Sequence, residues 1–140
     1  MRVYLAAAWS RKDEIKKIAD DLIELGVNVQ ARWLEEPTTS PYGIDRSTFM
    51  RERAEIDVDD VLACDILVRF SDNLCTATVP SGLATGARMF ETGLAWSLRK
   101  KIIVVGGFQC VFDYLGDVRH VPDVLALKTY FIMQQRGMIQ

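Results

Sequence analysis

The chain has 140 residues, of which 49% are hydrophobic and 26% charged, a composition typical of one globular domain over residues 1–140. Its apolar stretches are far shorter than the roughly 20 residues that cross a bilayer, and the N-terminus lacks a signal-peptide pattern. We therefore expect a soluble cytoplasmic protein with no membrane partner. Seventeen Lys and Arg against nineteen Asp and Glu give a net charge of −2, and no segment concentrates basic residues. This balance argues against a nucleic-acid polymer as partner.

Few side chains are suited to bind a metal. Cys64, Cys75 and Cys110 show no CxxC spacing, and His120 is the only histidine. A zinc site is therefore not expected, and we expect reduced thiols. Catalysis by a Cys–His or Ser–His pair would depend on His120 alone, so we expect carboxylates to carry any chemistry, without a cofactor.

The first part of the chain predicts a strand, a helix and a second strand. Residues 3–8 form an apolar run that ends at Trp9, which is typical of a buried parallel strand. Ser10 is predicted to cap a helix whose apolar side chains recur at helical spacing as far as Gly26. Residues 27–33 alternate between apolar and polar side chains, which predicts a half-exposed strand before a polar loop.

The rest of the chain continues this alternation. The predicted elements are a helix over 47–64, a strand over 66–70, a loop over 71–82, a helix over 84–98, strands over 102–105 and 118–121, and a helix over 122–136. Alternating strands and helices indicate an α/β fold. We predict a single three-layer, doubly wound domain, flavodoxin- or Rossmann-like, with a mostly parallel sheet of about five strands.

Glu91 interrupts the apolar face of the helix predicted over 84–98. The other positions on that face are Ala84, Ala87, Leu94, Ala95 and Leu98. A carboxylate that is buried ionised and unpaired costs several kcal/mol. Glu91 is therefore out of register, ion-paired or retained for chemistry.

Asp57 shows the same anomaly in the helix before it. It lies on the side that carries four apolar residues, Ala54, Val58, Val61 and Leu62. Helices of a parallel sheet present their N-terminal parts near its carboxyl edge, where α/β folds place ligand sites, so both acids could face one cleft. The alternative is that they pair with Arg53, Arg88 or a neighbouring subunit.

Several segments resemble the nucleoside 2-deoxyribosyltransferase family, which includes nucleoside 5′-monophosphate N-glycosidases. They are YLAAAW at 4–9, Asp57 with ACDILV at 63–68, GARMFETGLA at 86–95, KIIVVG at 101–106 and VFDYL at 111–115. The last three are similar to the family pattern G-R-x-x-E-x-G-x-A…K-P-V-I-x-x-G…V-F-x-Y-L. The likeness covers most of the chain.

The resemblance implies roles for residues in these segments. Glu91 would be the nucleophile at C1′ of the sugar, Asp57 would assist the departing base, and Tyr4 would hydrogen-bond the glutamate. Three more residues are implied in substrate binding: Thr85, Gly86 and Arg88. Relatives complete their pockets with a neighbouring subunit, which implies a homo-oligomer. The last helix, with Tyr130, Phe131, Ile132 and Met133, would suit such an interface or would pack on its own sheet.

Cleavage of an N-glycosidic bond needs two acids. A carboxylate near C1′ stabilises the oxocarbenium-like transition state or bonds to the sugar, and a carboxyl of raised pKa protonates the base. Trp9 would stack on the base or fill the core. Ser10 and Arg11, at the start of the first helix, would receive a 5′-phosphate or belong to a solvated helix start.

The leading hypothesis is an enzyme that cleaves the N-glycosidic bond of nucleosides or their 5′-monophosphates and transfers 2-deoxyribose to another base. The first alternative is hydrolysis by a nucleoside 5′-monophosphate N-glycosidase, because the same groups support both outcomes. The second is a non-catalytic nucleotide-binding or sensing domain. A flavodoxin-like cofactor site is disfavoured, because AAAWSRK after the first strand is not a Gly-rich phosphate loop.

Overall fold

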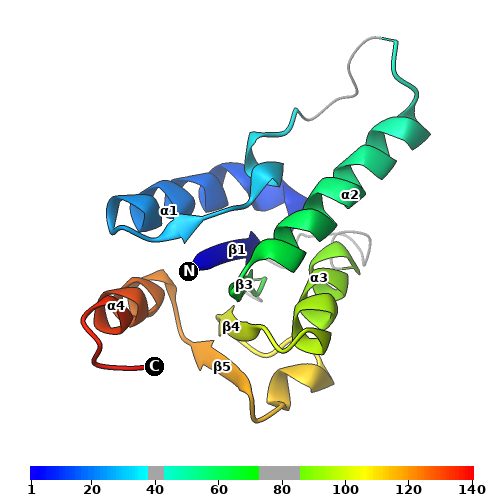
Figure 1. The fold of residues 1–140 in the computed structure, drawn as a ribbon. Coiled ribbons are helices and arrows are strands. Elements are labelled where there is room, and N and C mark those ends of the chain that lie inside the picture. The colour runs from blue at the N-terminus through cyan, green and yellow to red at the C-terminus, as the bar shows by residue number, and fades with distance from the viewer. Residues whose placement is uncertain (38–42, 73–85) are drawn as a thin grey trace.

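The computed structural model describes residues 1–37, 43–72 and 86–140 and shows a parallel sheet between two layers of helices (Figure 1). Its five strands are β1 (Arg2–Ala6), β2 (Asn28–Val29), β3 (Ile66–Phe70), β4 (Lys101–Val105) and β5 (Val118–Val121). Their order across the sheet is β2-β1-β3-β4-β5, and all four neighbouring pairs are parallel. The predicted α/β architecture is confirmed.

The helices are α1 (Lys12–Glu24), α2 (Arg46–Ala63), α3 (Gly86–Ser97) and α4 (Val124–Gln135). Figure 1 shows α1 and α4 on one face of the sheet and α2 and α3 on the other. Lys128 of α4 forms an ion pair with Asp21 of α1 at 2.5 Å, so these two helices lie next to each other in their layer. The predicted three layers are therefore present.

The three central strands form the core, because side chains on both of their faces are covered by helices. Every residue of β3 is buried, as are the last four residues of β1 and of β4. Such strands are nearly continuous apolar runs, which explains why they are recognisable in the sequence. α1 buries one stripe against this core, and Gly26 ends it at φ +82°, a conformation that favours glycine.

The predicted cap at Ser10 is wrong. Ser10 lies inside a short 3-10 helix, η1 (Trp9–Arg11), and α1 follows it without a side-chain cap. The backbone N–H of Arg11 instead donates to the carbonyl of Ala8 at 2.9 Å. The chain thus forms a 3-10 turn after β1, and this turn gives the backbone N–H of Arg11 an acceptor. In a helix capped by Ser10, that N–H would be in the first turn and would have no partner within the helix.

The strand predicted over 27–33 is also mostly wrong. Only β2 is paired there, and a 3-10 helix, η2 (Arg32–Glu35), follows. The side chain of Trp33 turns into the core, where its Nε1–H donates to the carbonyl of Leu5 at 2.8 Å. Asp60, fully buried on α2, accepts from the backbone N–H of Arg32 at 2.9 Å. These two long-range bonds end the strand early.

The packing of α4 decides between the two interpretations of its aromatic residues. Tyr130 and Phe131 are buried in the core of their own chain and contact each other edge to face at 5.3 Å between ring centroids. They are therefore core residues and not a surface for another subunit.

Residues 38–42 and 73–85 lie outside the described residues, and with them Cys75, Thr85, most of the loop predicted over 71–82 and the first residues of the helix predicted over 84–98. Within the described ranges, no helix is long and apolar enough to cross a membrane. In the same ranges, no three His, Cys, Asp or Glu side chains are grouped as a metal site would need.

Candidate active site

Tyr4 and Glu91 meet between the sheet and α3. The hydroxyl of Tyr4 donates a hydrogen bond to Glu91 Oε1 at 2.8 Å. Tyr4 is fully buried in the middle of β1, so its hydroxyl has a fixed position. The bond joins residues 87 positions apart in the chain, and the second oxygen of Glu91 accepts no hydrogen bond from the described residues.

Asp57 lies on α2, the helix that packs beside α3. Its Oδ1 atom is buried and accepts no hydrogen bond from the described residues. Burial raises the pKa of Asp57 to about 7, and the nearby charges of Glu36 and Asp60 add to the effect. Asp57 is therefore a carboxyl group that holds a proton near neutral pH.

Burial likewise raises the pKa of Glu91 to about 8. The hydrogen bond from Tyr4 acts in the opposite direction, because it favours the ionised form. The charge of Asp57 raises the pKa further. Burial also raises the pKa of Tyr4 well above its usual range, and the charges of Glu91 and Asp57 add to this effect. Tyr4 stays protonated and remains a donor. The two acids interact and titrate as a pair.

The arginines that could have neutralised these acids have other partners. Arg53 pairs with Glu36 at 2.6 Å, and Arg88 pairs with Asp72. Among the described residues, no cation forms an ion pair with Glu91, and none does with Asp57. The interpretation of both acids as members of structural ion pairs is therefore not supported. Arg88 is fully buried, so its guanidinium is not a solvent-facing ligand group.

The apolar faces predicted around the two acids are partly wrong. Ala54 and Leu62 of α2 are exposed, as are Ala87 of α3 and Leu98, which follows the end of α3. α3 packs on the sheet through Arg88 and Ala95, so the predicted stripe is rotated toward α2 and solvent. Glu91 therefore lies at the edge of the buried face and is partly exposed.

Trp9 and Arg11 lie at the carboxyl end of β1. Trp9 is 42% exposed, and its ring packs at 5.9 Å and 40° against that of Trp33, so it does not simply fill the core. Arg11 donates through Nε and Nη2 to Glu14 and through Nη1 to the carbonyl of Ser71. Arg11 therefore ties the start of α1 to the end of β3.

The structure brings only some of the other predicted residues to this site. Gly86 is the first described residue of α3 and is exposed, while Thr85 lies outside the described residues. Sequence reasoning missed Glu36, a buried carboxyl group beside Asp57. Glu36 stands in a polar run, EEPTTSPYG, where no hydrophobic period could have marked it as buried.

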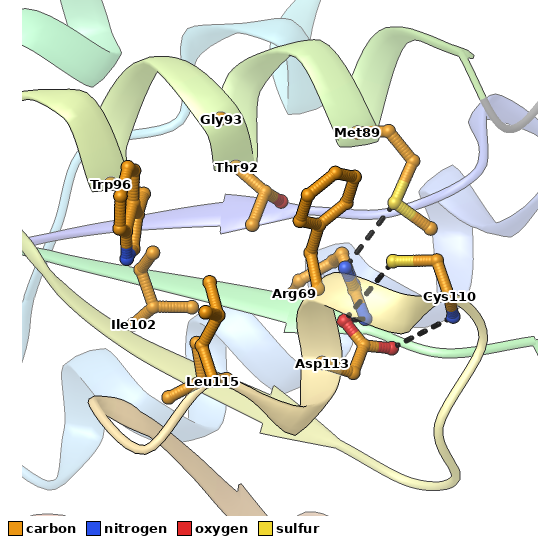
Figure 2. A pocket seen from close by; sticks show the side chains of 11 residues that line it. Arg69, Met89, Thr92, Gly93, Trp96, Ile102, Cys110, Asp113 and Leu115 are labelled. Carbon is orange, nitrogen blue, oxygen red and sulfur yellow. Dashed lines mark hydrogen bonds and ion pairs between the residues drawn. The ribbon is translucent and has the colours of Figure 1, made fainter.

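A cavity of about 480 Å³ lies on the other side of α3 (Figure 2). It is lined on that helix by Met89, Thr92, Gly93 and Trp96, which a rotation of 100° per residue places away from Glu91. An ion pair between Arg69 and Asp113, 2.6 Å long, borders it. The cavity is therefore distinct from the space between Glu91 and Asp57.

Gly93→Ala is expected to stabilise the protein by about 0.5–1 kcal/mol, because glycine inside a helix is less favourable than alanine. A Cβ added at Gly93 would meet no atom within 4 Å. Urea denaturation checks this. Gly26→Ala is the matched control and should destabilise, since Gly26 has φ +82°. A loss of stability in Gly93→Ala would contradict the prediction.

The chain matches no protein-family model and no curated protein. The solved structures that share its architecture include two enzymes. The CMP N-glycosidase BcmB of Clostridium botulinum is 21% identical, with a TM-score of 0.56 over 94% of this chain and 98% of the other. A 2-deoxyribosyltransferase of Bacillus psychrosaccharolyticus is 14% identical, with a TM-score of 0.63 over 93% and 92%. The chain has the fold of these enzymes. At such identities the likeness concerns the fold alone.

Proposed function

We propose that the protein cleaves the N-glycosidic bond of nucleosides or nucleoside 5′-monophosphates and transfers 2-deoxyribose to a second base. The observation that carries the proposal is the hydrogen bond of 2.8 Å from Tyr4 to Glu91, beside a second acid, Asp57, with no cation paired to either among the described residues. Buried acids of raised pKa are typical of catalytic sites.

In the proposed reaction, the free oxygen of Glu91 attacks C1′ of the sugar and forms a glycosyl–enzyme ester. The bond between C1′ and the base nitrogen breaks, and the base keeps the electron pair and takes a proton from Asp57. Tyr4 orients Glu91 through the other oxygen. An incoming base then attacks C1′, gives its proton to Asp57 and releases Glu91. Water in place of that base yields the free sugar.

Incubation of the purified protein with a deoxynucleoside and a second free base tests the proposal. Exchange of the bases supports transfer. Free sugar or sugar phosphate without exchange supports hydrolysis, the alternative outcome. Binding of a nucleotide without cleavage over hours would support a sensing domain.

The pH profile of kcat/KM is expected to be bell-shaped, with its maximum between about pH 7 and 8. Between the two pKa values the pair holds one proton, which lies mainly on Glu91 because its pKa is the higher. The reactive arrangement is the other one-proton form, in which Glu91 is ionised and Asp57 carries the proton. Well below the pKa of about 7 both acids are protonated, and well above about 8 both are ionised. Initial rates from pH 5 to 10 check this. A flat profile through pH 7–8, with full activity at pH 5 or 10, would contradict it.

We also propose that the protein acts as a homo-oligomer. Tyr130 and Phe131 are buried and are not available to another subunit. Exposed apolar side chains lie on α3 and on the 3-10 helix η3 (Val111–Tyr114), at Phe90, Val111, Phe112 and Tyr114. Light scattering coupled to size-exclusion chromatography measures the subunit number.

A further inference from the structure

Glu36 is a buried carboxylate with one unused oxygen. It follows η2 and is 9% exposed. Oε2 forms an ion pair with Arg53 at 2.6 Å, whereas Oε1 is buried and accepts no hydrogen bond from the described residues. A buried acceptor without a donor costs about 1–3 kcal/mol, and more when charged, so a bound donor would remove an existing penalty.

Glu36 is connected to the proposed catalytic acid, Asp57, through Arg53 and through its charge. Arg53, which holds Glu36, precedes Asp57 by one helical turn, so both are on the same side of α2. The charge of Glu36 is, after burial, the largest influence that raises the pKa of Asp57. Asp57 Oδ1 is a second buried acceptor without a donor among the described residues. The site therefore offers two buried acceptor oxygens.

Lys12 connects the backbone of Glu36 to the exposed indole of Trp9. Lys12 Nζ donates a hydrogen bond to the backbone carbonyl of Glu36 and lies 4.8 Å from the centre of the Trp9 ring. An aromatic surface and an acidic group are thus linked by a single lysine. A flat heteroaromatic ring bound near the indole of Trp9 would therefore lie close to the segment that carries Glu36.

We propose that Glu36 selects the base, by accepting through Oε1 a hydrogen bond from the exocyclic amino group of cytosine or adenine. A carboxylate only accepts, so it pairs with an amino group and repels the carbonyl oxygen that uracil or hypoxanthine carries at the same position. This inference rests on the proposed function and names the substrate within it. Hydrogen bonds to charged groups are strong enough for about a 10–100-fold preference.

The test compares kcat/KM for matched substrates, deoxycytidine against deoxyuridine and deoxyadenosine against deoxyinosine, each also as the 5′-monophosphate. The unmodified protein is expected to favour the amino member of at least one pair by about 10–100-fold. Glu36→Gln should reduce this ratio to within about threefold, because an amide both donates and accepts. The ratio does not depend on the fraction of folded protein.

Glu35→Gln is the matched control. Glu35 is the preceding residue, its side chain is 71% exposed, and it pairs with Lys16 at 3.0 Å on the surface. The Glu35→Gln variant should leave the ratio of kcat/KM values for amino and oxo substrates unchanged. Cleavage with equal rates for amino and oxo substrates, or an unchanged ratio in Glu36→Gln, would overturn the inference and leave the proposed function standing.

If no substrate is cleaved, the proposed function fails, and binding decides the inference separately. Calorimetry with free cytosine and free uracil is then the measurement. Tighter binding of cytosine that disappears in Glu36→Gln supports the role of Glu36. Equal binding of the two bases, or binding of neither, overturns it.

Discussion

Glu91→Gln is expected to lower kcat for glycosidic cleavage by about 10³–10⁶-fold, the range seen when a nucleophile is removed. The amide is a poor nucleophile and cannot stabilise positive charge at C1′, although it can still accept the hydrogen bond from Tyr4. Single-turnover assays measure the loss. Full activity in Glu91→Gln would show that another group attacks the sugar.

The same variant is expected to be more stable than the unmodified protein at neutral pH, by about 1–3 kcal/mol. The pKa of Glu91 is about 8 in the folded chain against 4.5 ordinarily. Between these values the unfolded chain releases the proton more readily, so ionisation favours unfolding as pH rises. The stabilisation by Gln should therefore vanish near pH 4 and grow toward pH 8. Chemical denaturation at several pH values checks this, and an equal difference at pH 4 and 8 would contradict it.

Asp113→Ala is expected to cost about 3–5 kcal/mol of unfolding free energy, because it leaves the guanidinium of Arg69 buried without its partner. Arg69 is 1% exposed in the middle of β3, and Asp113 is 2% exposed on η3, at 2.6 Å. Asp113 also accepts from the backbone N–H of Gln109 at 2.7 Å. The expected loss of unfolding free energy therefore includes both the ion pair with Arg69 and the hydrogen bond that holds the turn at Gln109.

Two further variants make this measurement specific. Asp117→Ala is the surface control, since exposed Asp117 accepts only from the indole of Trp96 at 3.0 Å among the hydrogen bonds described, and a change below about 1 kcal/mol is expected. The double variant Arg69→Met with Asp113→Leu should recover most of the loss. An Asp113→Ala variant that is as stable in urea as the unmodified protein would contradict the prediction.

The residues that could be recognised from the sequence are those whose signal is local and periodic. β3 and β4 are apolar runs, and α1 repeats its buried side chains at helical spacing. Glu91 stood out because it interrupts such a repeat, and its Tyr4 contact places it against the sheet. The resemblance to N-glycosidic enzymes added roles to these residues, and those roles stay predictions.

Contacts between distant segments have no such signal. Glu36 belongs to a polar run, yet η2 and Arg53 bury it. Arg69 in a strand of hydrophobic residues is neutralised by Asp113, 44 positions later, and neither residue identifies the other. Trp33 ends β2 early through a bond to Leu5 across the sheet.

The order of amino acids alone was enough to specify a parallel α/β sheet and to mark two acids out of place, because hydrophobic period and local chemistry are properties of short segments. The direction that each helix turns, the partner of each buried charge and the separation of the cavity from the acids depended on packing across the whole chain. A buried charge is tolerated only where a distant residue compensates it, so only the folded molecule shows which acids are paired and which are free to react.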